Sequence, residues 1–517
     1  MILAMKAGVR RFSAAILLPA GILMLSAAGA AGKNSPTPAE PLPEAKAKII
    51  RLIEEKRIPS LSLAVVMDGK IIWEEAFGLA DVDHKVTAAP STLYPIASAT
   101  KPITATALMI LVERGLVDLD QPANSYLAGP KLRAYDGDAS GATVRRILHH
   151  TSGLPMYWGF SFAGSSRARP PLETTLERYG RLMFKPGEVH HYSNLGYAVL
   201  ESIIERVSGK SYPEFLAEEV FRPLSMRETA VFTAPPEGRP AAVKYSVTRA
   251  AVPFCDHDTR GAGAIYATAR DLALFMSLHL GRQREGQPAI LKPESIAAMQ
   301  QARDPDVRSS SYAFGWETGS RYGYSILTHG GVMDGCRAHM ALIPSEGLGA
   351  AVLINGENVR SIEVCDWIFA ALLPEYARNF KTAPPGDGPP PPPPPFRPVA
   401  ALVGSWQGLI QTFEGDIPVR LVVETDGRIE LARLGPEGAL EKAFTPLKAP
   451  AVSRGFLVIH FPQLFSTPDA TASDHRTVLR MRIHPNRLSG EANTIASDES
   501  YFLPSFIVLE RIKPETP

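Results

Sequence analysis

Seven consecutive prolines at residues 389–395 restrict the fold of this 517-residue chain more than any other segment. Proline fixes φ at about −65° and has no backbone N–H, so such a run enters neither a helix interior nor the middle of a sheet. It adopts polyproline II, about 3.1 Å per residue, and acts as a semi-rigid spacer. We therefore expect residues 384–398 to be a linker between a larger domain at residues 44–380 and a smaller one at residues 399–517.

The smaller domain consists of short alternating or apolar segments that turn residues separate. A succession of such segments is typical of an all-β barrel or sandwich. We recognise no set of catalytic residues and no internal repeat there. The segments lie at residues 404–411, 418–424, 428–433, 456–461, 477–484, 487–492 and 506–509.

The larger domain has strand patterns at both of its ends and mainly helical patterns between them. A hairpin is expected at residues 61–77, with its turn at Asp68-Gly69. Strands resume near residues 323–328, 338–343 and 348–354, and a helix follows near residues 361–373. This order predicts an α+β fold, in which one antiparallel sheet is assembled from both ends of the domain. A helical lobe is inserted, and the site lies at the junction of sheet and lobe.

The N-terminus has the pattern of a secretory signal peptide. Lys6, Arg10 and Arg11 precede an apolar stretch at residues 13–26, and the small residues Ala28-Gly29-Ala30 follow it. The apolar stretch is shorter than the ~20 residues that span a bilayer, which favours cleavage over an uncleaved anchor. We expect a signal peptide at residues 1–30, a disordered leader at residues 31–43, a periplasmic or secreted location, and no stable membrane span after processing.

Charge and cysteine content limit the possible partners. The net charge is +1 and no basic run lies outside the N-terminus, which argues against nucleic-acid binding. Three cysteines, Cys255, Cys336 and Cys365, leave at least one thiol unpaired in an oxidising compartment, and the sequence leaves open whether two of them pair.

Three short motifs carry the chemistry: Ser98-Ala99-Thr100-Lys101, Tyr192-Ser193-Asn194 and His329-Gly330-Gly331. Residues 98–112 are expected to begin a buried helix, on which positions i and i+3 share a face, so the Lys101 amine can reach the Ser98 hydroxyl. A serine needs a base to become a nucleophile, and lysine serves as one only when its pKa is lowered. Each motif is weak alone, but together they indicate acyl transfer through a covalent serine intermediate.

The chain resembles the serine β-lactamase and penicillin-binding-protein family. The resembling branch contains class C β-lactamases, D-alanyl-D-alanine carboxypeptidases, D-aminopeptidases and related esterases. The resemblance covers roughly residues 44–375, and the C-terminal domain resembles the lipocalin-like barrels appended to some members. Besides the three motifs it is carried by Leu148-His149-His150-Thr151-Ser152-Gly153-Leu154, Lys185-Pro186-Gly187-Glu188, Gly261-Ala262-Gly263 and Phe314-Gly315-Trp316.

The resemblance implies roles for individual residues. Ser98 matches the acylated nucleophile, and Lys101 and Tyr192 match the groups that move its proton, with the choice of base left open between them. Asn194 matches the amide that orients the acyl group. The backbone N–H groups of Ser98 and Val332 match the two oxyanion donors.

The third motif departs from the β-lactamases, which have Lys-Thr-Gly where this chain has His329-Gly330-Gly331. A neutral imidazole anchors a substrate carboxylate less well than an ammonium group, and Gly330 brings no hydroxyl. We therefore expect an esterase or D-amino-acid peptidase rather than a β-lactamase, acting on a small ester, a D-amino-acid peptide or a cell-wall peptide.

Two alternatives to an active hydrolase remain. One is a catalytically weak β-lactam or peptidoglycan sensor, and the other is a ligand-binding protein that acts through its C-terminal barrel. We expect no cofactor and no metal, because the histidines at residues 149–150 and 190–191 are adjacent pairs whose side chains diverge.

Overall fold

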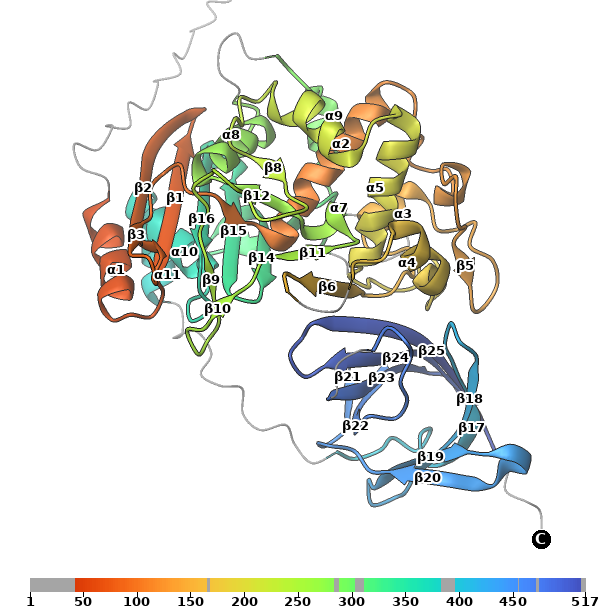
Figure 1. Ribbon diagram of the computed structural model, residues 1–517. Coiled ribbons are helices and arrows are strands. Elements are labelled where there is room, and N and C mark those ends of the chain that lie inside the picture. Colours follow the sequence, from red (N-terminus) through yellow and green to blue (C-terminus); the bar gives the residue numbers. More distant parts are fainter. Residues whose placement is uncertain are drawn as a thin grey trace, which may run out of the picture. The chain divides into compact units, whose positions relative to one another are not determined.

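The computed structural model describes residues 42–164, 168–282, 288–302, 311–382, 396–453, 455–470 and 474–512 (Figure 1). The predicted signal peptide, almost all of the predicted leader and the seven prolines lie outside these residues. Within the described ranges no helix is both long enough and apolar enough to cross a membrane.

An antiparallel sheet forms the centre of the larger domain, and it combines both ends of that domain as predicted. The N-terminal hairpin β1 (Ser60–Met67) and β2 (Lys70–Asp81) pairs through β1 with β16 (Leu348–Ile354), the last strand of the domain. At the hairpin turn Asp68 and Gly69 both have positive φ, as a tight two-residue turn requires. The remaining strands are β3 (Val86–Thr87) beside β2, and β15 (Cys336–Ile343), β14 (Tyr324–Met333) and β13 (Glu317–Arg321) beyond β16.

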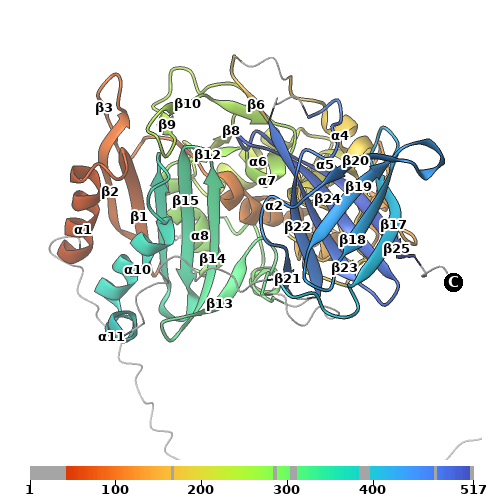
Figure 2. The ribbon, with the colours of Figure 1, turned by 90° about the horizontal axis from the view of Figure 1, so that it is seen from below.

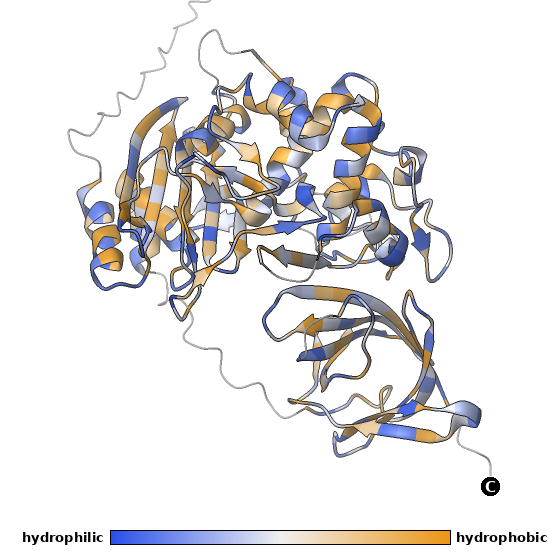
Figure 3. Ribbon diagram, viewed as in Figure 1, coloured by the Kyte–Doolittle hydropathy of each residue, from blue (hydrophilic) through white to orange (hydrophobic). Residues whose placement is uncertain are grey.

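Helices cover both faces of this sheet (Figures 1 and 2). Leu61, Leu63 and Val65 of β1 share a core with α1 (Pro43–Glu54) and α10 (Ser361–Leu372). Ala64 and Val66, which alternate with them, belong to the core that contains α8 (Ala269–His279). Because both faces are buried, β1 and β16 are apolar along almost their whole length (Figure 3).

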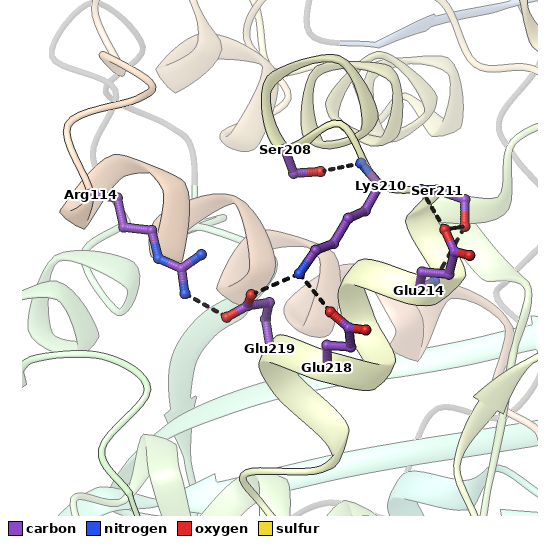
Figure 4. A network of polar contacts seen from close by, with 7 residues as sticks. All are labelled: Arg114, Ser208, Lys210, Ser211, Glu214, Glu218 and Glu219. Carbon is purple, nitrogen blue, oxygen red and sulfur yellow. Dashed lines mark hydrogen bonds and ion pairs between the residues drawn. The ribbon is translucent and has the colours of Figure 1, made fainter.

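The helical lobe is built around α2 (Lys101–Glu113), most of whose residues are buried. It packs against α5 (Asn194–Ser208) and the π-helical turn η3 (Ala217–Phe221). At the end of α2, Arg114 bonds Glu219, and Lys210 binds both Glu218 and Glu219 (Figure 4). The other elements of the lobe are α3 (Val144–Leu148), α4 (Leu172–Tyr179), α6 (Tyr212–Leu216), α7 (Arg260–Gly263), α9 (Pro293–Met299) and the short strands β4 (Tyr94–Pro95), β5 (Arg133–Ala134), β6 (Trp158–Phe162), β7 (Arg181–Leu182), β8 (Ala230–Val231), β9 (Lys244–Tyr245), β10 (Ala251–Val252), β11 (Cys255–His257) and β12 (Ile265–Ala267).

The C-terminal part is a curved antiparallel sheet with its own core around the buried Trp406. Its strands run in the order β20-β19-β18-β17-β25-β24-β23-β22-β21. The predicted all-β fold is present, but the ladder is open between β20 and β21 in the described residues, so the sheet is a half-barrel, and likeness to lipocalins stays a prediction. The strands are β17 (Gly404–Gln411), β18 (Asp416–Val423), β19 (Ile429–Leu434), β20 (Leu440–Phe444), β21 (Ala451–Ser453), β22 (Phe456–Pro462), β23 (His475–Ile483), β24 (Arg487–Ala496) and β25 (Tyr501–Arg511).

Strand β25 also pairs with a strand of the larger domain. Tyr501 and Phe502 pair with Gly159 and Trp158 of β6, which in turn pairs with β11. Polar contacts join the two parts elsewhere: His191 Nε2 lies 3.1 Å from Glu491 Oε2, and the Tyr179 hydroxyl donates to Asp469 Oδ2 at 2.6 Å.

Candidate active site

Ser98 lies on a short 3₁₀ turn, η1 (Ala97–Thr100), and not on the α-helix expected to begin there. The α-helix α2 begins at Lys101, with Pro102 in its first turn, where the missing N–H leaves no intrahelical bond unmade. In a 3₁₀ helix side chains three residues apart eclipse each other, so Ser98 and Lys101 still face one way. Ala97, directly before the serine, has a φ of +45°, a conformation that alanine adopts only under constraint.

The Lys101 amine is completely buried and has three hydrogen-bond partners. Nζ lies 3.1 Å from Ser98 Oγ, 2.8 Å from Asn194 Oδ1 and 3.0 Å from the Ala262 carbonyl oxygen. Its side chain is 0% exposed, and burial lowers its pKa well below the usual lysine value. None of the three partners is a carboxylate, so nothing in direct contact restores the ammonium form.

The start of α5 supplies the second motif. Ser193 caps the helix, accepting from the Gly196 N–H at 2.8 Å and donating to the Pro155 carbonyl at 2.6 Å. This cap fixes the residues on both sides: Asn194 turns toward Lys101, and the Tyr192 ring lies beside the Lys101 amine, with Nζ 4.7 Å from the ring centroid. Burial raises the pKa of Tyr192, so the phenol keeps its proton at neutral pH.

His150 supports Tyr192, a role that the sequence did not identify. The two rings are 4.3 Å apart, and His150 Nδ1 accepts a hydrogen bond from the Ser193 N–H at 3.1 Å. Burial lowers the pKa of His150 well below its usual value, so the ring stays neutral. His150 has a φ of +58° and lies directly before the Thr151-Ser152-Gly153 segment.

His329 is buried behind the site. Its side chain is 1% exposed, Nδ1 donates to the Gly330 carbonyl at 2.8 Å, and Nε2 accepts from the Tyr312 hydroxyl at 2.9 Å. Burial lowers its pKa to about 3. His329 thus holds Tyr312, whose ring lies 4.4 Å from that of His150, and its contact with a substrate stays a prediction.

Gly331 and Val332 bring β14 alongside Ser98. A Cβ on Gly331 would lie 1.9 Å from the carbonyl oxygen of Ile96, so only glycine permits this approach. The next residue, Val332, is 67% exposed and lines the cavity that contains Ser98. At Gly330 a Cβ would lie 3.1 Å from His339 Nδ1, which is a milder restriction.

The cavity in front of Ser98 has a volume of about 290 Å³. Tyr192 and Asn194 line it together with Ser98, so four predicted site residues, Val332 included, share one cavity. His329 lies outside that lining. The apolar part of the wall is formed by Met156, Trp158, Phe160 and Met333.

The family model named Beta-lactamase matches residues 45–372 of the chain. The protein belongs to the beta-lactamase family. Unguisins hydrolase ungD' of Aspergillus campestris is 30% identical over 338 residues, which are 61% of this chain and 62% of that protein. Protein flp of Staphylococcus aureus (strain MW2) is 26% identical over 317 residues, 59% of this chain and 61% of that protein. The match thus spans less than two thirds of the length of these relatives.

The crystal structure of SurE shares the fold, with a TM-score of 0.60 and 22% sequence identity. The structural match covers 91% of this chain and 99% of the SurE chain, so the likeness extends beyond the part that matches the family model.

One further residue of this beta-lactamase-family site, Glu201, belongs to none of the sequence motifs. Glu201, two turns along α5 from Asn194, is buried and accepts a hydrogen bond from the Gly261 N–H at 2.7 Å. Burial raises its pKa to about 8. It holds the Gly261-Ala262-Gly263 segment, whose Ala262 carbonyl contacts Lys101. No sequence motif marks Glu201, because its contact with Gly261 joins residues 60 positions apart.

All three cysteines of this family member are buried and unpaired. Among the residues that the structure describes, no group of histidine, cysteine, aspartate or glutamate side chains is arranged to hold a metal ion.

Proposed function

We propose that the protein is a serine hydrolase that cleaves an ester or amide bond through an acyl-enzyme on Ser98. The observation that carries this proposal is the buried amine of Lys101, 3.1 Å from Ser98 Oγ and without a carboxylate partner. Such an amine is neutral and can take the proton of an attacking hydroxyl.

Lys101 acts as the base and Tyr192 relays the proton. The lowered pKa of the amine and the raised pKa of the phenol favour this division over the reverse. As Ser98 attacks the substrate carbonyl, its proton moves to Lys101 and then, through the Tyr192 hydroxyl, to the leaving group. The backbone N–H groups of Ser98 and Val332 stabilise the oxyanion, each contributing roughly 10²- to 10³-fold in rate. A water molecule then attacks the acyl carbonyl carbon. Its proton moves through the same groups, Lys101 and Tyr192, to Ser98 Oγ, which leaves as the hydroxyl when the acid is released.

Esters and D-amino-acid amides fit this site better than β-lactams. The third motif presents no fixed cation to a substrate carboxylate, because His329 is neutral and buried. A relative bearing the name of a hydrolase supports an enzyme over a silent binding protein. The contacts of Lys101 with Ser98, with Asn194 and with the Tyr192 ring point the same way. The exported location is part of this proposal and rests on the N-terminal sequence pattern.

Labelling with a fluorophosphonate tests the nucleophile. A peptide containing Ser98 should gain the mass of the probe, and Ser98→Ala should abolish both labelling and hydrolysis of p-nitrophenyl acetate. Lys101→Ala should lose several orders of magnitude in kcat, since nucleophile and base act as a unit. Ser325→Ala, an exposed position on β14, is the matched control and should behave like the wild type. Label on another serine would refute the assignment.

A further inference from the structure

The residue before Tyr192 is held by both parts of the molecule. His191 Nε2 lies 3.1 Å from Glu491 Oε2 on β24 of the C-terminal sheet. His191 Nδ1 lies 3.0 Å from the Leu154 carbonyl oxygen, which belongs to the larger domain. A carbonyl oxygen only accepts, so Nδ1 carries a proton and donates it there. The imidazole ring is therefore fixed on two sides, once by each part.

Glu491 is a buried carboxylate at this contact, with 1% of its surface exposed. Burial disfavours its charge, but His191 and Arg480, whose Nη1 is 3.7 Å away, outweigh burial and lower the pKa of the carboxyl below its usual value. A buried ion pair adds little net stability, because apolar residues of the same volume often stabilise an interface equally well. The pair therefore indicates a directed contact at this position.

The C-terminal sheet presents Glu491 from a fixed position. In the turn between β24 and β25, the Glu499 carbonyl accepts from the Trp158 Nε1–H at 2.8 Å, and the Ser500 carbonyl accepts from the Phe160 N–H at 2.9 Å. These bonds attach the end of β24 to β6 of the larger domain, beside the pairing of β25 with β6. The place of Glu491 is thus set by contacts other than its own ion pair.

The position of His191 is passed on to Tyr192 through the backbone. The His191 N–H donates to the His150 carbonyl at 2.7 Å, and the Ser193 N–H donates to His150 Nδ1 at 3.1 Å. Tyr192 lies between these two bonds, with its ring 4.3 Å from that of His150 and 4.7 Å from Lys101 Nζ. A shift of His191 would therefore move Tyr192 relative to Lys101.

We propose that Glu491 is a positioning residue, through which the C-terminal sheet holds Tyr192 in place for proton transfer. Glu491 does not line the cavity in front of Ser98 and acts through His191. The proposal rests on the acyl-enzyme function of Ser98 and on the relay by Tyr192. It adds a residue that lies outside the family match at residues 45–372.

Two esters with one acyl group and different leaving groups test this in the full chain. Phenyl acetate and p-nitrophenyl acetate form the same acetyl-enzyme, and kcat/KM reports the steps up to release of the phenol. Phenolate is the more basic leaving group, so its release depends more on a proton from Tyr192. Glu491→Leu keeps the volume but removes the carboxylate. It should lower the ratio of phenyl to p-nitrophenyl acetate kcat/KM at least about tenfold, within the roughly 10²- to 10⁴-fold that a positioned acid contributes.

Further variants assign the effect. Tyr192→Phe should lower the ratio at least as far, and Glu491→Leu added to it should lower the ratio no further, because both act on one step. Asp469→Leu removes a different interface carboxylate, the partner of the Tyr179 hydroxyl, and is the matched control. It should lower the melting temperature and keep the wild-type ratio. Should Glu491→Leu be insoluble, the double variant with His191→Leu leaves neither partner of the buried pair alone and carries the same expectation.

A wild-type ratio in folded Glu491→Leu, an equal fall in Asp469→Leu, or a further fall in the Tyr192→Phe background would overturn the proposal. If Ser98 is labelled by the fluorophosphonate and Tyr192→Phe lowers the ratio but Glu491→Leu does not, the hydrolase function stands and only the positioning role fails. If Tyr192→Phe leaves the ratio unchanged, the relay and the positioning role fail together. If Ser98 is not labelled, the hydrolase function fails with them.

Discussion

At the residue scale, burial sets the protonation states of the site. Burial lowers the pKa values of Lys101, His150 and His329 and raises that of Tyr192, which favours the neutral form of each. No charged partner is needed to depress the pKa of Lys101, because desolvation does so.

His329 should not titrate in the range where enzyme assays are made. Its pKa of about 3 lies far below neutrality, so it stays neutral from pH 5.5 to 7.5. From the sequence alone, the ordinary histidine pKa of about 6.5 would predict better β-lactam turnover near pH 6. The structure predicts instead that the ratio of nitrocefin to p-nitrophenyl ester kcat/KM stays flat over this range. A ratio that rises several-fold toward pH 5.5, and no longer rises in His329→Asn, would contradict this prediction.

Glu201 should make the stability of the fold depend on pH. Its pKa is raised from 4.5 to about 8 in the folded state, so the folded chain binds more protons than the unfolded chain between these values. The contribution of Glu201 to the free energy of unfolding is present in full below about pH 4.5 and is lost as the pH rises through 8. The free energy of unfolding falls by at most about 1.4 kcal/mol per pH unit over this range.

Glu201→Gln keeps an acceptor for the Gly261 N–H but does not titrate, so this part of the pH dependence should disappear. Denaturant unfolding at pH 5, 6.5 and 8 measures it. The exposed Glu177 of α4 offers a control, since Glu177→Gln should leave the slope unchanged. An identical slope in wild type and Glu201→Gln would show that Glu201 is already ionised in the fold.

At the scale of elements, the site is where β14, η1 and α5 meet, and this arrangement depends on Gly331. Gly331→Ala should push β14 away from Ile96, since the new Cβ would lie 1.9 Å from its carbonyl oxygen. We expect at least a 10²-fold fall in kcat/KM for p-nitrophenyl acetate, from displacement of one oxyanion donor. The overpacking should also cost about 1–3 kcal/mol of stability.

Gly319→Ala on β13 is the matched control, because nothing lies within 4 Å of the Cβ that it would add. The two variants are compared by kcat/KM and by the midpoint of urea unfolding. Equal activity in both would mean that the approach of β14 to η1 is not needed for catalysis.

The sequence predicted well the elements whose pattern is local. The hairpin at β1 and β2, the closing strands β14 to β16 and helix α10 follow from period-two and period-3.6 patterns. It missed β20 and β21, which are short and mostly exposed and so lack an apolar repeat. It also placed Ser98 in an α-helix, because a 3₁₀ turn that leads into a helix has no distinct pattern. The burial of His329 and the contact of Glu201 with Gly261 depend on residues distant in sequence, so no motif could show them.

At the scale of the whole molecule, the C-terminal sheet and the catalytic domain share buried surface. Tyr501, Leu503 and Ala496 belong to the same apolar core as the helical lobe. A semi-rigid proline spacer at residues 384–398 predicts that few contacts cross between the two parts and that residues 399–517 fold independently. The contacts of β25 with β6 favour interdependence instead.

A chain that ends at Thr382 tests this. Removal of the sheet would expose the apolar surface under Tyr501 and leave His191 without Glu491. We expect lower soluble yield, a lower melting temperature and at least tenfold lower kcat/KM for p-nitrophenyl acetate than the full chain. Asp469→Asn, which weakens one interface contact without removing the sheet, should lie between the two. A truncated chain with the melting temperature and activity of the full chain would show that the larger domain folds and works independently of the C-terminal sheet.

The attachment of the β24–β25 turn to β6 has a consequence for how such proteins diverge. The family match ends at residue 372, whereas Glu499 lies far beyond it in the sequence and still lines the cavity in front of Ser98. Two homologues with identical nucleophile, base and amide motifs can therefore differ in substrate through a hairpin that motif comparison never examines. New selectivity can evolve in the appended sheet while the catalytic motifs stay unchanged.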